Sequence, residues 1–318
     1  RQSRPAEDAG QKNKPAEDAG QKNKPAEDFE RKRKGRIVKP TTAIRRRLAR
    51  IGKQADGDIE LTEAAMVLAS IDHPGGVVES YNRHLKRLAD DVGAYAGGPE
   101  GVAGCDLNLR RDAIRQVVAK RYGYAGSEEV YEEKEGANLM RVIDRRRGLP
   151  VVLGLIYLHV AGQLGWIARG LDFPARFLVQ LEFGGKRLIL DPFAGGRTLE
   201  ARNMRDLYKA VAGNQAELTP DQYRPVGNRN ILLRIQNNVK IRYLRAERLE
   251  DALGAIELML LFAPAEADLW REAGLLNARL DRVKEAVTAL EESMRHQKSE
   301  AGRYRTSVLL RELRGRLG

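Results

Sequence analysis

The segment PVVLGLIYLHVAGQLGW, residues Pro150–Trp166, constrains the fold more than any other part of the chain. It contains no Asp, Glu, Lys or Arg and is apolar on nearly every side of a helix. It is shorter than the roughly 20 apolar residues that a helix needs to cross a bilayer. We therefore predict a helix buried at the centre of a domain, beginning at Pro150 and ending at Gly165. His159 is then expected to be a satisfied core or boundary histidine.

The sequence after this helix predicts a small antiparallel sheet. Apolar stretches at about Arg176–Glu182 and Arg187–Leu190 are typical of strands, and the joining FGGK is typical of a hairpin turn. Beyond Arg197 we expect no further strand. A central helix followed by paired strands, and preceded by several helices, indicates an α+β domain.

Several segments before the central helix have the apolar spacing of amphipathic helices. The expected helices cover Thr41–Gly52, Leu61–Asp72, Val77–Ala96, Asn108–Arg121 and Asn138–Arg146. Thr62 is the expected N-cap of the second helix, and Gly148 is expected to close the last one. The Gly- and Pro-rich stretch Gly97–Gly104 predicts a loop.

From about Leu233 the chain repeats itself with a period of 34 residues. Trp270 and Gly274 match the W…G positions of a tetratricopeptide helix, and Ala286 matches its small-residue crossing point, where two helices approach closely. The predicted repeats cover Leu233–Pro264 and Ala267–Lys298, with Tyr304–Leu317 as a capping helix. We therefore expect an all-α tail over residues 226–318, and such repeats usually bind protein partners or dock on their own domain.

The N-terminus consists of a degenerating decapeptide repeat: RPAEDAGQKN, KPAEDAGQKN and KPAEDFERKR. Such a segment buries too little apolar surface to offset its ordering entropy, so we predict that residues 1–40 are disordered. Residues 1–50 hold 16 Lys and Arg against 7 Asp and Glu, whereas the other 268 residues hold 40 against 37. The basicity therefore belongs to the tail, and weak nucleic-acid contact is expected only through residues 30–39.

Cysteine and histidine usage limits the chemistry of the chain. Cys105 is its single cysteine, which excludes an internal disulfide and is typical of a reducing compartment such as a bacterial cytoplasm. The four histidines are scattered, without metal-ligand spacing. We expect neither a metal site nor a cofactor.

A resemblance to a known family rests on several short motifs. These are Arg146-Arg147-Gly148-Leu149-Pro150, Tyr157, Phe173-Pro174, Phe177 and Asp191-Pro192-Phe193-x-Gly195-Gly196. With the helices before them and the repeats after them, they resemble the bacterial SirB-type family over about Leu61–Lys298. The resemblance implies a transglutaminase-like, papain-like α+β core over residues 41–225, followed by the tetratricopeptide tail.

The wider transglutaminase-like superfamily implies a Cys-His-Asp triad. A thiolate at a helix N-terminus is stabilised by the helix dipole and a histidine, and the carboxylate orients that histidine. Alignment of the helix start puts Pro150 at the thiol position, and the Pro174-Ala175-Arg176-Phe177 segment puts Arg176 at the histidine position. Only Asp191 keeps its residue type. Loss of the cysteine is itself similar to the SirB-type pattern.

Three interpretations of Arg176 and Asp191 follow. Arg176 faces solvent while Asp191 caps its turn, or the two form a guanidinium–carboxylate pair, or Arg176 binds an anionic ligand in a residual pocket. A separation beyond about 4 Å would exclude the pair. Cys105 is the only alternative thiol, and no histidine lies near it in sequence.

These observations favour a catalytically inactive scaffold or regulatory protein that binds partners through its repeats. Two alternatives remain. One is a hydrolase or acyltransferase with an unrecognised active site, and the other is an RNA-associated protein acting through the basic tail.

Overall fold

Helix α8 (Pro150–Gln163) is the buried helix that its apolar sequence predicts. The structure is a computed structural model that describes residues 40–131, 133–174 and 176–316. Pro150 occupies the first turn of α8, and Gly165 follows the helix with a φ of 68°. The predicted disorder of residues 1–40 lies outside the described residues, except at Pro40. The described residues belong to one compact unit, Val38–Gly318.

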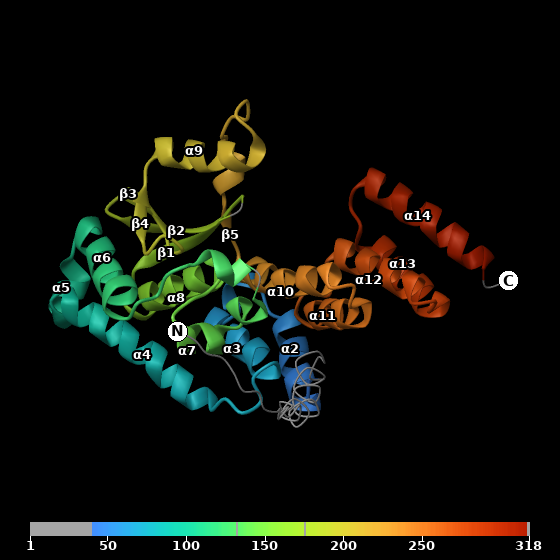
Figure 1. The fold of residues 1–318 in the computed structure, drawn as a ribbon, viewed down its shortest axis with the longest axis horizontal. Helices are drawn as coiled ribbons and strands as arrows, with labels where there is room; N and C mark the ends of the chain where they lie inside the picture. Colours follow the sequence, from blue (N-terminus) through green and yellow to red (C-terminus); the bar gives the residue numbers. More distant parts are fainter. Residues whose placement is uncertain (1–39, 132, 175, 317–318) are drawn as a thin grey trace, which may run out of the picture. The chain divides into compact units, whose positions relative to one another are not determined.

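The sheet packs one face on α8, as Figure 1 shows. Its strands are β1 (Ile167–Phe173), β2 (Arg176–Phe183), β3 (Lys186–Asp191), β4 (Arg197–Leu199) and β5 (Pro225–Val226). All pairings are antiparallel, in the order β4-β3-β2-β1-β5. The predicted hairpin is confirmed, and Gly184 and Gly185 both take the positive φ that a tight turn between β2 and β3 requires.

Our expectation that no strand follows Arg197 is wrong, because β4 begins at that residue and β5 lies beyond it. β1 is a further strand, next to the predicted hairpin. β4 spans three residues and β5 spans two. Segments this short carry no alternating pattern, and their strand conformation depends on the pairing with β3 and β1.

Helix α9 (Ala201–Ala212) covers the other face of the sheet. Leu171 and Leu178 from the sheet pack with Met204 of α9 in one buried cluster. On the α8 side, the ring of Phe177 presses against Gly154 so closely that an added Cβ would lie 2.3 Å from it. The sheet is therefore enclosed between two helical layers.

The predicted N-terminal helices are present with revised boundaries. They are α2 (Thr42–Gly52), α3 (Leu61–Ile71), α4 (Val78–Tyr95), α6 (Leu107–Ile114) with a π-helical continuation over Arg115–Arg121, and α7 (Leu139–Arg145). The expected loop Gly97–Gly104 is instead largely helix α5 (Gly98–Gly104), with a proline in its first turn.

Two expected helix ends are also wrong. Glu60 occupies the N-cap position of α3, while the Thr62 hydroxyl lies 3.0 Å from His159 Nδ1. Arg146 is the C-cap of α7 and takes the left-handed conformation with a φ of 60°, so Gly148 lies beyond the cap. Glu60 makes no side-chain capping hydrogen bond, and Arg146 closes α7 through its backbone N–H, which donates to the Val142 carbonyl.

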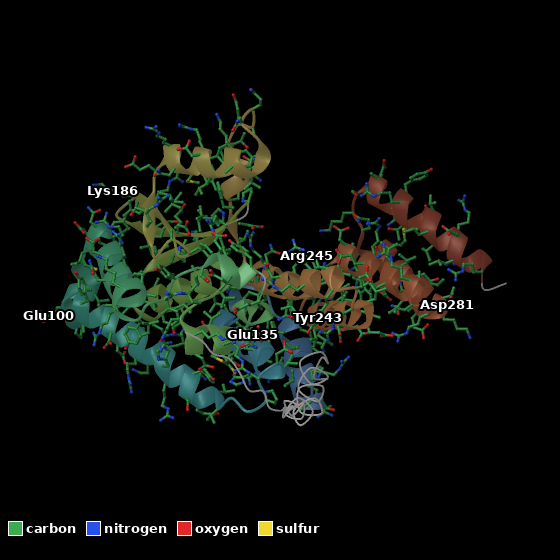
Figure 2. The ribbon with its side chains drawn as sticks, viewed as in Figure 1. Glu100, Glu135, Lys186, Tyr243, Arg245 and Asp281 are labelled. Atoms are coloured by element: carbon green, nitrogen blue, oxygen red, sulfur yellow. The ribbon has the colours of Figure 1, made fainter. Side chains whose placement is uncertain are left out.

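From Asn228 on, the described C-terminal part contains helices and no strand, as the 34-residue period predicts, while Val226 of the predicted all-α tail belongs to β5. Its helices are α10 (Asn228–Arg245), α11 (Leu249–Phe262), α12 (Ala267–Arg279), α13 (Val283–His296) and α14 (Glu300–Gly315). Gly274 lets α12 approach α13, because a Cβ there would lie 2.6 Å from Leu290. Tyr243 and Arg245, labelled in Figure 2, lie near the end of α10, where the chain turns into α11.

Candidate functional site

The structure brings two of the three predicted triad positions together. Arg176 begins β2 and Asp191 ends β3, and Arg176 Nε lies 3.9 Å from Asp191 Oδ2. Pro150 begins α8, and Gly154, one turn later on the same side of that helix, contacts Phe177. The N-terminal half of α8 therefore packs against β2 just after Arg176.

Asp191 serves two partners with one carboxylate. Its side chain is only 3% exposed. Oδ1 accepts hydrogen bonds from the backbone N–H groups of Phe193 at 3.0 Å and Ala194 at 3.2 Å, while Oδ2 faces Arg176. The turn cap and the pair with Arg176 therefore occur together.

Aromatic side chains cover the guanidinium of Arg176, whose side chain is 24% exposed. Arg176 Nη1 donates to Tyr131 Oη at 3.0 Å, and its guanidinium carbon lies 4.4 Å from the centre of the Phe193 ring. The Phe193 ring in turn packs against Gly126, where an added Cβ would overlap it. Because a guanidinium stays protonated at any working pH, this arrangement contains no general base at Arg176.

The glycines of the Asp191-Pro192-Phe193 turn allow its shape. Gly195 and Gly196 both have positive φ, at 65° and 74°. A Cβ on Gly196 would lie 2.8 Å from Tyr157 Oη, and that hydroxyl is buried without a hydrogen-bond partner among the described residues. Burial raises the pKa of Tyr157 far above its ordinary value, so the phenol stays neutral.

The Arg146-Arg147-Gly148 motif is held by local contacts. The Arg146 guanidinium donates to the Ile143 carbonyl and the Tyr124 hydroxyl, and it lies 3.1 Å from His84 Nε2. Burial, with a smaller contribution from Arg146, lowers the pKa of His84 to about 4, so the neutral ring accepts this bond.

The other two residues of the motif are also fixed by the chain around them. Arg147 Nη1 donates to the Gly123 carbonyl at 2.7 Å. Gly148 packs on Val142, where an added Cβ would lie 2.7 Å from the side chain. Both contacts shape the turn before α8.

Comparison with known proteins gives the family. Residues 79–237, half of the chain, match the family model described as the transglutaminase-like superfamily. The chain belongs to the transglutaminase-like superfamily. Residues 239–312 of this superfamily member match the tetratricopeptide repeat model, which confirms the predicted tail.

Curated relatives of this superfamily member come from several bacteria. A UPF0162 protein of Vibrio cholerae is 28% identical over 75% of this chain and 86% of its own length. A UPF0162 protein of Xylella fastidiosa strain Temecula1 is 27% identical over 74% and 83%. Protein SirB1 of Salmonella typhimurium is 26% identical over 53% and 63%, in agreement with the SirB-type resemblance. No solved structure matches.

Cys105 does not join the predicted triad positions. It is buried after α5, and its Sγ lies 3.4 Å from the Val102 carbonyl oxygen. Its own carbonyl accepts from Arg110 Nε at 3.1 Å. These contacts are those of a small packed side chain in this superfamily member.

Only one of the two ring nitrogens of His159 has a hydrogen-bond partner among the described residues. Nδ1 meets Thr62, but Nε2 is buried without a hydrogen-bond partner among the described residues, and burial lowers the pKa of the ring. The expectation of a satisfied core histidine therefore holds for one ring nitrogen.

Sequence reasoning missed the role of α10 beside the Arg176–Asp191 pair. Arg234 Nη2 donates to the carbonyls of Arg176 at 2.7 Å and Phe173 at 3.3 Å. Arg242 Nη2 donates to the carbonyls of Tyr131 at 2.8 Å and Val130 at 3.2 Å. Two arginines of one helix thus bind the backbone carbonyl of Arg176 and that of Tyr131, whose hydroxyl accepts a hydrogen bond from Arg176. Seven of eighteen residues on α10 are buried, and nothing in its pattern marks these two arginines as anchors.

The buried carboxylate of Asp191 predicts a pH-dependent stability. Burial raises its pKa above the ordinary aspartate value, although Arg176 and the two backbone amides act in the opposite direction. Between the unfolded and folded pKa values the folded state binds more protons, so stability falls as pH rises through that window. From pH 3.5 to pH 7, we expect the free energy of unfolding of Asp191→Asn to rise relative to that of wild type, because the variant lacks the carboxylate that ionises in this range.

Urea unfolding at the two pH values measures this difference. The matched control is Asp206→Asn, which removes an exposed carboxylate of α9, and its effect is subtracted. If wild type instead becomes more stable relative to Asp191→Asn as pH rises, the ion pair with Arg176 outweighs the cost of burying the carboxylate.

Proposed function

We propose that this chain is a non-catalytic member of the transglutaminase-like superfamily that acts as a scaffold or regulatory protein and binds protein partners through its tetratricopeptide segment. The observation that carries the proposal is the contact between Arg176 and Asp191. A cation that cannot accept a proton occupies the position that the sequence comparison predicts for the imidazole base of the superfamily's mechanism.

The thiol position supports the same conclusion. Pro150 is a buried proline in the first turn of α8, and its ring offers no nucleophile. Asp191 points one oxygen at the backbone of its own turn and the other at a guanidinium. Acyl transfer needs an activated nucleophile and a base within hydrogen-bond reach, and these three residues supply neither.

The helical tail supports the binding part of the proposal. Tetratricopeptide repeats suggest protein–protein interaction, and residues 239–312 match that repeat. The arginines of α10 and the packing of α2 on α11 tie these helices to the α+β core. We assign residues 41–225 to the core and 226–318 to the binding part, with the core as the rigid support.

Two further predictions are not tested by the described residues. Nucleic-acid contact through residues 30–39 lies outside the described residues and stays a prediction, as does a cytoplasmic location. No helix in the described part of the chain is long and apolar enough to cross a membrane.

The full chain is expected to lack acyl-transfer and thiol-hydrolase activity. We expect no incorporation of a fluorescent primary amine into a glutamine-containing peptide, and no labelling by thiol- or serine-directed active-site probes at native pH. Fluorescence after gel separation measures both, with a commercial transglutaminase as the positive control. Incorporation or labelling that disappears in Cys105→Ser, or in any single serine variant, would contradict the proposal.

A further inference from the structure

A groove of about 610 Å³ lies between the end of β1, helix α10 and the first turns of α12. Its polar lining includes Asn230, Asn237 and Asn238 on α10, with Glu266, Asp268 and Glu272 at α12. We call it the α10–α12 groove. Its volume is in the range of sites that enclose a small ligand or a few residues of a peptide.

The cations of the α10–α12 groove are already neutralised. Arg234 forms an ion pair with Asp172, and Lys240, which is 5% exposed, pairs with Glu272. All four of these residues line the groove. Neither cation is therefore available to an incoming anion without breaking an existing pair.

Two carboxylates of the groove remain unpaired. Glu266 and Asp268 are exposed, and among the described residues neither side chain forms an ion pair or a hydrogen bond. Both lie at the N-terminal end of α12, Glu266 at the N-cap and Asp268 in the first turn. The lining therefore carries a surplus of two negative charges, which favours a cation and disfavours nucleic acid.

The asparagines add groups that suit an extended backbone. Asn230 and Asn237 are seven residues apart on α10 and lie on the same side of the helix, and neither side chain makes a hydrogen bond among the described residues. A carboxamide donates and accepts at once, as a peptide group requires. Leu233 is partly exposed and supplies apolar surface against which the aliphatic part of a long basic side chain can pack, while Met259 and Leu269 of the lining are buried.

We propose that the α10–α12 groove binds an extended segment of a partner protein that carries lysine or arginine. The cationic side chains would face Glu266 and Asp268, and the backbone would face the asparagines of α10. The proposal rests on the proposed interaction function, and it names the chemistry of the partner.

The test uses the full chain and a fluorescent decapeptide with four lysines separated by serine and alanine, read by anisotropy at 50 mM salt. A peptide with four glutamates in the same positions is the paired probe. Because the chain has a net charge of +12, non-specific attraction would favour the glutamate peptide. We expect the lysine peptide to bind more tightly.

The variant Glu266→Lys/Asp268→Lys reverses the local charge, and we expect it to weaken lysine-peptide binding by at least about tenfold. The matched control Glu300→Lys/Glu312→Lys makes the same change of charge at exposed positions of α14, one of them also in a first helical turn. We expect it to change the affinity by less than about threefold, because neither residue lines the groove and salt screens the interaction between separated exposed charges.

Circular dichroism and urea midpoints check that both variants fold. If the charge reversal does not fold, Glu266→Gln/Asp268→Asn replaces it, and we expect binding to weaken in the same direction. Equal losses in the groove and control variants, tighter binding of the glutamate peptide, or unchanged binding in the groove variant would each overturn the inference. The proposed function fails on a different result, namely amine incorporation or probe labelling.

Discussion

Replacing Phe177 by alanine should lower the free energy of unfolding by about 3–5 kcal/mol, the usual cost of removing a large buried ring. The side chain is fully buried, and its ring touches Gly154 of α8 and Gly170 of β1. Both glycines lack a side chain that could move into the space, so the cavity stays open. Urea unfolding at neutral pH, followed by circular dichroism, measures the change.

The same substitution at the other end of β2 provides the control. Phe183 is 37% exposed and stacks on Arg110, whose guanidinium carbon lies 3.8 Å from the ring centre. We expect Phe183→Ala to cost about 1 kcal/mol. Equal effects at both positions would show that the ring of Phe177 does not fill a rigid space.

A second pair of variants tests the contact with α8 directly. Gly154→Ala should destabilise wild type by about 1–3 kcal/mol, because the added Cβ overlaps the ring of Phe177. In the Phe177→Leu background that cost should shrink, since the smaller side chain leaves room. Additive effects would contradict the packing described here.

Replacing Arg234 by methionine should lower the free energy of unfolding by about 2–4 kcal/mol. The variant keeps the apolar stem but removes the donors to the carbonyls of Phe173 and Arg176, and it leaves Asp172 without its cation. Backbone carbonyls that lose a charged donor in a partly buried site are costly to leave unpaired. Urea unfolding gives the size of the effect.

Arg245→Met is the matched control, because Arg245 is exposed at the last residue of the same helix (Figure 2). We expect its effect to stay within about 0.5 kcal/mol. Hydrogen exchange adds a local readout, since Arg234→Met should speed exchange in the β1–β2 region, whereas Arg245→Met should not. Faster exchange confined to α10 would mean that Arg234 stabilises its helix and not the strands.

Local patterns predicted the elements whose energetics are local or dominated by burial. The all-apolar helix α8 is stable only in a core, so its own sequence predicts burial whichever elements pack against it. The 34-residue period likewise predicted paired helices, because each small residue such as Ala286 marks a crossing point. Gly184 and Gly185 identified the hairpin through their backbone freedom.

Tertiary contacts decided what local patterns leave open. β4 and β5 are too short to form without the strands beside them. The side chains of Thr62 and Arg146, near the ends of α3 and α7, contact His159 and Tyr124. Each depends on residues many positions away, which no short window of sequence contains.

The sequence by itself determined the fold class, the repeat tail and the residue types at the three predicted triad positions. It established that Pro150 and Arg176 cannot act as nucleophile and base, since that follows from their chemistry alone. Only the tertiary structure decided that Arg176 lies beside Asp191, the Phe193 ring and the Tyr131 hydroxyl, and that Arg234 of α10 binds the backbone carbonyl of Arg176. Which side chains meet depends on the packing of whole elements, and so does the unpaired charge left in the α10–α12 groove.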